Sequence, residues 1–194
     1  MKHILSRRGL LTGAAAALAV PEFAFAQGDV APTPACHDGD PPTVRQTDGP
    51  FFKPSSPERA DLRGGGPPGR ALDVSGFVVS RSCRPVGHAL IDVWQADDAG
   101  RYDNRGFVLR GHLFTDDAGR FTLRTIVPGG YDGRTRHIHV KVQAPGKPVL
   151  TTQLYFPDEP LNRTDGLYRR ELTMRLNQAD DRVLGRFDFV LDLG

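Results

Sequence analysis

From Ala71 onward, the chain consists of short runs that alternate apolar and polar residues or are rich in β-branched residues. Turn-forming segments rich in Asp, Gly and Pro separate these runs, for example at 97–100, 116–119 and 128–130. No amphipathic helix of ordinary length is evident. Strands at this spacing indicate an all-β fold, an antiparallel β-sandwich or barrel. The runs are ALDVSGFVVS, ALIDVWQA, GHLFTDDAGRFTLRTI, RHIHVKVQA, VLTTQLYF and GRFDFVLDL.

The first 26 residues have the pattern of an export signal. A basic start precedes an apolar run over 10–20, and a small-x-small sequence follows at 24–26. This is typical of a cleavable secretory peptide, and the apolar run is too short to span a membrane. The pair Arg7-Arg8 resembles the twin-arginine signal of bacteria, and an ordinary secretory signal is the alternative. We therefore expect export through the twin-arginine machinery to a periplasmic or extracellular location.

Residues 27–70 have a different composition, because they hold nine of the 16 prolines. Such a segment predicts an extended Pro/Gly-rich arm that lies on a core domain formed by residues 71–194. The two cysteines of the chain are Cys36 in this arm and Cys83 in the core. In an oxidising compartment we expect a disulfide between them, with two free thiols as the alternative.

Length and charge narrow the classes of function. A chain of 194 residues that is 39% hydrophobic is long enough for one domain with a sizeable core. The formal net charge is +2, and the first 26 residues account for it. The remainder is near neutral, so nothing in the charge indicates a nucleic-acid partner.

The stretch GRTRHIHVKV, residues 133–142, places two histidines one residue apart within an alternating run. Because side chains of a strand alternate between faces, His137 and His139 share one face, and Ile138 and Val140 share the other. Two imidazoles on one face can bind the same metal ion. A solvent-facing polar stripe is the alternative interpretation.

Two of the four tyrosines stand in turns before this stretch, Tyr102 in AGRYDNRG and Tyr131 in VPGGYDGRTRHIH. Phenolates are hard anionic oxygen ligands, so a site that joins two of them to two imidazoles favours Fe(III) over zinc. Each tyrosine could instead be a half-buried ring with its hydroxyl in water.

Five ordered segments give the chain a family resemblance. TDGPFF, ALIDVWQADDAGRYD, FTDDAGRFTLRTIVPGGY, RTRHIH and TTQLYF, from about Thr47 to about Phe156, closely resemble the intradiol ring-cleavage dioxygenases. This is the family of catechol 1,2-dioxygenase and protocatechuate 3,4-dioxygenase. The resemblance implies a non-haem Fe(III) enzyme on a β-sandwich core. It also implies cleavage of a catechol by O2 between the two hydroxyl-bearing carbons, to a cis,cis-muconate-type dicarboxylate.

The resemblance assigns four iron ligands. Tyr102 matches the tyrosinate that is retained throughout turnover, and His139 matches the equatorial imidazole. Tyr131 matches the axial tyrosinate that leaves when substrate binds, and His137 matches the axial imidazole.

Further roles follow from the same resemblance. Arg134 matches the arginine that stabilises negative charge on the bound substrate, and Gln153 matches a glutamine near the iron. Pro50 falls where the arm of the family lines the substrate cleft. Arg136 is a second candidate for the active-site arginine, although strand alternation favours Arg134. Phe52 stands where the family has a tyrosine.

Two functions of other classes remain open at this point. One is a secreted β-sandwich binding module without iron, and the other is a copper or zinc protein that uses only His137 and His139. The sequence leaves no room before Thr47 for the helical dimerisation segment of catechol 1,2-dioxygenases, so the oligomeric state stays open.

Overall fold

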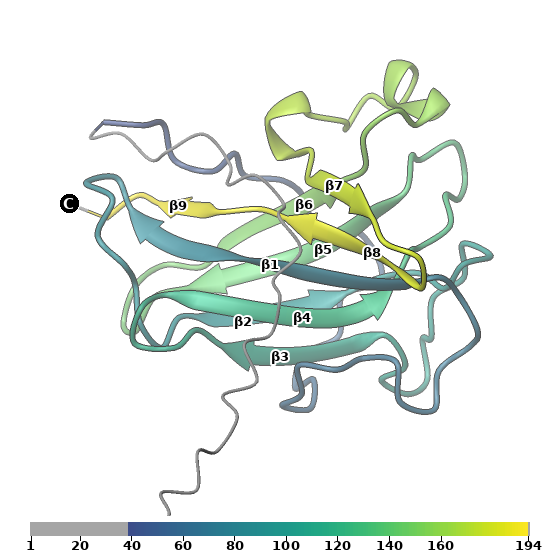
Figure 1. Cartoon of the computed structure of the whole chain (residues 1–194), viewed down its shortest axis with the longest axis horizontal. Helices are drawn as coiled ribbons and strands as arrows, with labels where there is room; N and C mark the ends of the chain where they lie inside the picture. Colours follow the sequence, from purple (N-terminus) through teal and green to yellow (C-terminus); the bar gives the residue numbers. More distant parts are fainter. Residues whose placement is uncertain (1–38, 194) are drawn as a thin grey trace, which may run out of the picture.

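The computed structural model describes residues 39–193, where β-strands form nearly all of the regular structure (Figure 1). No α-helix occurs in this described range, and two short 3₁₀ helices are η1 (Pro160–Arg163) and η2 (Arg170–Leu172). The strands are β1 (Ala71–Ser80), β2 (Leu90–Trp94), β3 (Arg110–Phe114), β4 (Arg120–Ile126), β5 (His137–Gln143), β6 (Leu150–Tyr155), β7 (Arg175–Gln178), β8 (Arg182–Arg186) and β9 (Phe189–Leu191).

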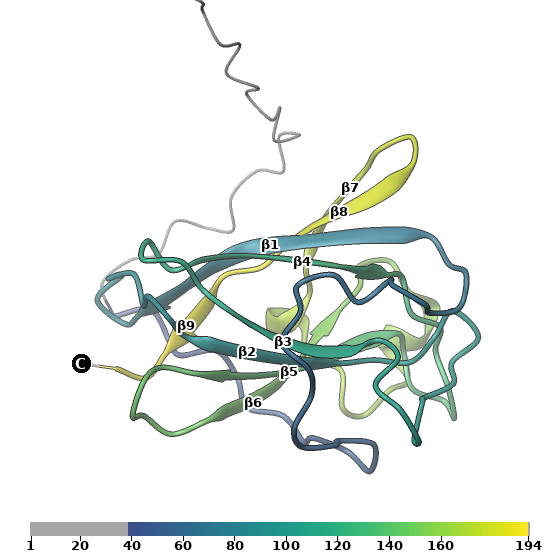
Figure 2. The same cartoon turned by 90° about the horizontal axis from the view of Figure 1, so that it is seen from below.

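The strands form two sheets that pack face to face as a sandwich (Figure 2). The first sheet has the order β4-β1-β8-β7, and β9 also pairs with β1. The second sheet has the order β3-β2-β5-β6. The β7–β8 hairpin extends beyond the two layers (Figure 2). The short turn at 116–119 leads from β3 in one sheet to β4 in the other.

The expectation of a wholly antiparallel sandwich is wrong for the first sheet. β1 pairs antiparallel with β4 but parallel with both β8 and β9. Parallel neighbours need a long crossover connection. Here the whole second sheet and β7 lie between β1 and β8 in sequence, and they provide that connection. The second sheet is antiparallel throughout.

The alternation seen in the sequence places the core between the sheets. Along β1, Leu72 and Val74 are fully buried and their neighbours are partly exposed, as a strand with one covered face requires. Gly76 lies where the pairing of β1 passes from β8 to β9. A side chain at Gly76 would collide with the backbone carbonyl of Phe187, so the close approach of the two chain segments depends on this glycine.

The described part of the arm, residues 39–70, contains no strand and crosses the outer face of the second sheet. Gln46 N donates to the carbonyl of Thr151 on the edge strand β6, at 2.8 Å. Further along, Arg59 N donates at 2.8 Å to the carbonyl of His112 on the opposite edge strand, β3. Leu62, at the end of this path, is fully buried in the core. The arm therefore covers the face of β5 that carries the two histidines.

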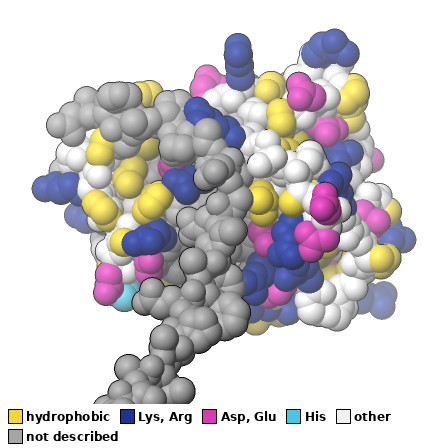
Figure 3. Space-filling model, in the orientation of Figure 1, with side chains coloured by type: hydrophobic (Ala, Val, Ile, Leu, Met, Phe, Trp, Pro, Cys, Tyr) yellow, Lys and Arg dark blue, Asp and Glu magenta, His cyan; other side chains and the backbone are white. Residues whose placement is uncertain are grey.

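Several sequence predictions fall outside the described residues. The export signal, the first part of the arm and Cys36 all precede residue 39. Cys83 is disulfide-bonded, and its pairing with Cys36 stays a prediction. No helix in the described part of the chain has the length and apolarity that crossing a membrane requires. On the face that Figure 3 shows, basic and acidic side chains are interspersed among the described residues.

Candidate metal centre

His137 and His139 lie on the outer face of β5, opposite the apolar face. Ile138 and Val140 point into the core and are 0% and 1% exposed, as the alternation predicts. The histidines, however, are not displayed to solvent, because they are only 2% and 1% exposed. The arm covers them, and a Cβ at Gly49 would lie 3.4 Å from Cε1 of His139. The solvent-facing polar stripe is therefore excluded.

The two imidazoles converge through their Nε2 atoms, which lie 3.2 Å apart. Nδ1 of His137 lies 2.7 Å from the carbonyl oxygen of Thr135. Because a carbonyl only accepts, Nδ1 carries the proton and the lone pair is on Nε2. Burial lowers the pKa of His137 to about 4 and holds the pKa of His139 well below its usual value. Both rings are thus neutral, as metal ligands must be.

Tyr102 and Tyr131 complete the group from two loops, one after β2 and one between β4 and β5. The two phenol rings meet edge to face with centroids 5.4 Å apart. The ring of Tyr102 lies 6.3 Å from that of His139, and the ring of Tyr131 lies 5.7 Å from that of His137. The structure thus brings together all four residues that the family resemblance assigns as ligands.

The tyrosine-bearing loops touch each other through glycine backbone. Gly100 has a φ of +79°, and a side chain there would collide with the carbonyl of Gly130. Gly129 N donates to the carbonyl of Asp97 at 2.8 Å, while the side chain of Asp97 accepts from Arg101 N at 2.8 Å. This close packing fixes the loop of Tyr102 against the loop of Tyr131.

The hydroxyl of Tyr102 shows whether these residues fit a metal ion. It is buried and makes no hydrogen bond of standard geometry within residues 39–193, although the phenol of Tyr131 lies near enough to interact with it. Burial raises the pKa of this phenol well above its usual value, and the neighbouring Tyr131 raises it further. A buried polar atom without a partner costs free energy unless a ligand satisfies it. A cation bound beside it would both satisfy the oxygen and favour the phenolate.

The donor types also discriminate between metals. No cluster of three or more His, Cys, Asp or Glu side chains in the described range could hold a metal ion. Beside His137 and His139, the tyrosines bring phenol oxygens to the group. Two imidazoles with two phenol oxygens suit a hard ferric ion better than zinc or copper. The site therefore fits Fe(III), and it argues against a copper or zinc protein that uses the histidines alone.

Arg134 lies beside this group, whereas Arg136 turns away from it. Arg134 Nη2 donates to Oε1 of Gln153 at 2.8 Å, and the positive charge of Arg134 contributes to the low pKa of both histidines. Arg136 instead forms an ion pair with Glu159 at 3.0 Å. This geometry favours Arg134 over Arg136 as the arginine of the site.

Gln153 connects the arm to Arg134. Its side chain is fully buried, and its Nε2 donates to the carbonyl of Thr47 at 2.9 Å. Its Oε1 accepts from Arg134 and lies 3.0 Å from the hydroxyl of Tyr155. Gln153 therefore satisfies backbone and side-chain groups at once, and its contacts position the residues around the metal centre.

The arm also supplies aromatic rings to the centre. Phe51, next to the exposed Pro50, stacks on Tyr102 with ring centroids 4.4 Å apart. Phe52 packs edge to face on Trp94, which in turn stacks on His139 at 4.8 Å with an interplanar angle of 7°. The sequence interpretation missed Phe51 and Trp94. Trp94 pairs with His139 across β2 and β5. Only the register of these two strands could have predicted that the two rings stack.

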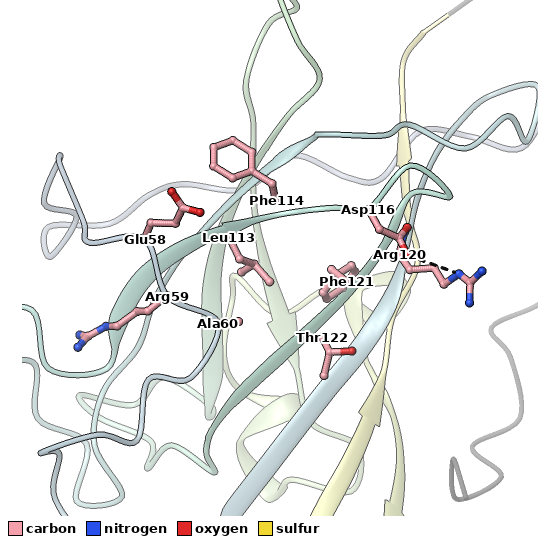
Figure 4. A pocket seen from close by; sticks show the side chains of 9 residues that line it. All are labelled: Glu58, Arg59, Ala60, Leu113, Phe114, Asp116, Arg120, Phe121 and Thr122. Carbon is pink, nitrogen blue, oxygen red and sulfur yellow. Dashed lines mark hydrogen bonds and ion pairs between the residues drawn. The ribbon is translucent and has the colours of Figure 1, made fainter. Parts of the chain in front are cut away.

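Another hollow lies away from this centre, where the arm passes β3 and β4 (Figure 4). It is an open depression that contains neither a candidate iron ligand nor Arg134. Its salt bridge joins Arg120 to Asp116 at 3.8 Å on the surface. Its lining residues are Glu58, Arg59, Ala60, Leu113, Phe114, Asp116, Arg120, Phe121 and Thr122.

Known proteins share both the sequence and the fold. A family model described as "Dioxygenase" matches residues 47–193. Catechol 1,2-dioxygenase 2 of Acinetobacter lwoffii is 31% identical, over 93% of this chain and 75% of that protein. The protocatechuate 3,4-dioxygenase beta chain of Burkholderia cepacia is 32% identical, over 65% of this chain and 60% of that one. The chain thus spans less than two thirds of the length of the second relative.

Two solved structures extend the comparison. The dioxygenase domain of a dioxygenase–carbohydrate-binding protein fusion from Streptomyces sp. SirexAA-E is 57% identical, with a TM-score of 0.77. The match covers 79% of this chain and 100% of that one. Hydroxyquinol 1,2-dioxygenase from Pseudomonas putida DLL-E4 is 25% identical with a TM-score of 0.70, over 79% of this chain and 67% of that one. On the family match and these relatives, the chain belongs to the intradiol ring-cleavage dioxygenase family.

Proposed function

We propose that the protein is a non-haem Fe(III) enzyme that cleaves a catechol between its two hydroxyl-bearing carbons. O2 is the second substrate, and both of its atoms enter a cis,cis-muconate-type dicarboxylate. The observation that carries this proposal is the convergence of two imidazoles and two phenols at one buried position. The buried hydroxyl of Tyr102 supports it, because this oxygen makes no hydrogen bond of standard geometry and a bound cation would satisfy it.

Each side chain has a distinct task in this proposal. Tyr102, Tyr131, His137 and His139 hold the ion, which when bound would accept both catechol oxygens and make the ring reactive toward O2. Tyr131 Oη accepts one of the two phenolic protons that a catechol must lose. Arg134 stabilises negative charge on the bound substrate by fixed electrostatics. Phe51 and the arm around it exclude water from the donor group.

In this proposal Tyr131 leaves the ion when the substrate binds. The loop that carries Tyr131 suits such a movement. Tyr102 stacks on Phe51, and its hydroxyl is enclosed. Both tyrosines are partly exposed, but Tyr131 is followed directly by two exposed residues, Asp132 and Gly133. A side chain on such a loop can move away from the centre at low cost, while an enclosed one cannot.

Purified protein gives a direct test. An Fe(III)–tyrosinate centre absorbs strongly in the visible, so the protein should be red to brown and contain one iron per chain. A binding module without iron should be colourless. Oxygen uptake should then be measured with catechol, protocatechuate, hydroxyquinol and chlorocatechols. Mass analysis of the product formed under ¹⁸O2 should show two labelled atoms. An iron-loaded protein that consumes no oxygen with any of these catechols would contradict the proposal.

A further inference from the structure

Asp165 is a buried carboxylate beside the metal centre that takes no part in the donor group. It lies between η1 and η2, and its side chain is 1% exposed. Nε of Arg134 donates to its two oxygens at 2.9 and 3.1 Å. The backbone N–H of Thr135 donates to Oδ2 at 3.0 Å, and that of Leu167 donates to Oδ1 at 2.9 Å. Both oxygens of the carboxylate are therefore engaged twice.

The same contacts restrict Arg134. Its Nε is held by Asp165 and its Nη2 by Gln153, and Tyr155 also interacts with the guanidinium; Nη1 makes no hydrogen bond of standard geometry within residues 39–193. A guanidinium is planar, so fixing two of its nitrogens fixes the direction of the third. The side chain is 17% exposed, so it is not sealed off from a ligand.

The fixed orientation of Arg134 matters because its positive charge lies near the proposed iron ligands. Arg134 Nη2 donates to Gln153, and Gln153 is the direct partner of His139 across β5 and β6. Arg134 is thus close to the donor group. A long side chain free to rotate would lose conformational entropy and reorganise each time charge developed on a substrate. An arginine that is already held in place avoids this cost.

We propose that Asp165 is a positioning residue, which orients the guanidinium of Arg134 so that Nη1 is directed at the substrate. This inference rests on the proposed function. Three N–H donors converge on the carboxylate: the Nε–H of the guanidinium, shared between both oxygens, and two backbone N–H groups. Asp165 therefore fixes Arg134 relative to the backbone that leads into β5 and not only to another mobile side chain.

The test is Asp165→Asn in the iron-loaded protein. The amide keeps the size but removes the charge, and its NH2 group cannot accept from Arg134 or from the backbone. We expect kcat to fall on the order of 10²-fold, because a misplaced group costs about that much. The KM for catechol should change far less. Iron content and the visible band should stay at wild-type values, since no ligand has changed.

Two further variants separate positioning from support of the fold. Glu159→Gln breaks the ion pair to Arg136, two residues from Arg134, and should leave kcat and KM unchanged. In an Arg134→Gln background, Asp165→Asn should produce no further loss of kcat, because the group that it positions is gone. An equal loss in both backgrounds would overturn the proposal, and so would wild-type kcat in the single variant.

Thermal unfolding should be recorded for every variant, because Asp165 also accepts from two backbone donors. If the Asp165→Asn variant loses iron or does not fold, the Asp165→Glu variant is used for the test. This variant keeps the carboxylate and displaces it by one methylene, so its smaller loss of kcat should also vanish in the Arg134→Gln background. Persistence of that loss would count against positioning. A wild-type protein that holds iron but cleaves no catechol would instead refute the proposed function, so the two failures are distinguishable.

Discussion

Replacing Tyr102 by Phe should affect the iron-free and the iron-loaded protein in opposite ways. The substitution removes one oxygen, the hydroxyl that is buried without a hydrogen bond of standard geometry, and keeps the ring that stacks on Phe51. A buried polar group left without a partner costs about 1–3 kcal/mol. The free energy of unfolding of the iron-free protein should therefore rise by about 1 kcal/mol or more. For a domain of this size, this is an increase in Tm of about 2–4 °C.

Iron binding should respond in the other direction. The Tyr102→Phe variant would offer the ion no oxygen at this position, so iron content should fall and the visible band should shift or fade. Turnover of catechol should fall with them. Calorimetry or circular dichroism of the iron-free variant, together with iron analysis and an absorption spectrum after reconstitution, measures both effects on one preparation.

Tyr155→Phe is the matched control, because that hydroxyl is also buried but is satisfied. It lies 2.8 Å from the carbonyl of Leu167 and 3.0 Å from Oε1 of Gln153. Its removal should lower the free energy of unfolding by about 1 kcal/mol. If Tyr102→Phe destabilised the iron-free protein as Tyr155→Phe does, the argument from the hydroxyl of Tyr102 would be wrong. If the Tyr102→Phe variant kept its colour and iron content after reconstitution, Tyr102 would not be an iron ligand.

Three other predictions concern separate parts of the molecule. His139→Ala should lower iron occupancy, measured by metal analysis, because a buried imidazole is lost and nothing replaces it. Arg134→Gln should keep iron and colour but reduce kcat on the order of 10²-fold, whereas Arg136→Gln should leave kcat unchanged; the reverse outcome would transfer the role to Arg136. A Cys36–Cys83 disulfide should lower the non-reduced mass by two hydrogens and stabilise the fold by about 4 kcal/mol in the chain-entropy model, and two alkylatable thiols would exclude it.

Strand alternation was enough to predict which residues share a face. It placed Ile138 in the core and His137 with His139 on the other side of β5, and the structure confirms both. Alternation could not predict what covers that other face. The cover comes from the arm, where Gly49 lies beside His139 and Phe51 packs on the two tyrosines. This segment is far from β5 in sequence and has no periodicity. The sequence around the histidines therefore could not predict that they are buried.

The sequence also could not predict which distant segments pair with each other. The local pattern of β8 gives no sign that it runs parallel to β1, because that direction depends on the path of the intervening chain. Asp165 was missed for a related reason. It lies in a polar stretch beyond the segments that carry the family resemblance, and its importance arises only from contact with Arg134, 31 residues earlier.

The position of the metal centre explains how one chain can combine a stable fold with a reactive site. The apolar faces of the two sheets bury each other, while His137, His139 and Trp94 project from the opposite side of the second sheet. The sandwich therefore has a core that does not include the metal ligands. Histidine side chains on an outer face are normally exposed to water. Here the arm crosses the sheet from β6 to β3 and shields them from solvent. Because a low dielectric strengthens every charge interaction within the site, the arm would contribute to the electrostatics of the proposed reaction as well as cover the donor group.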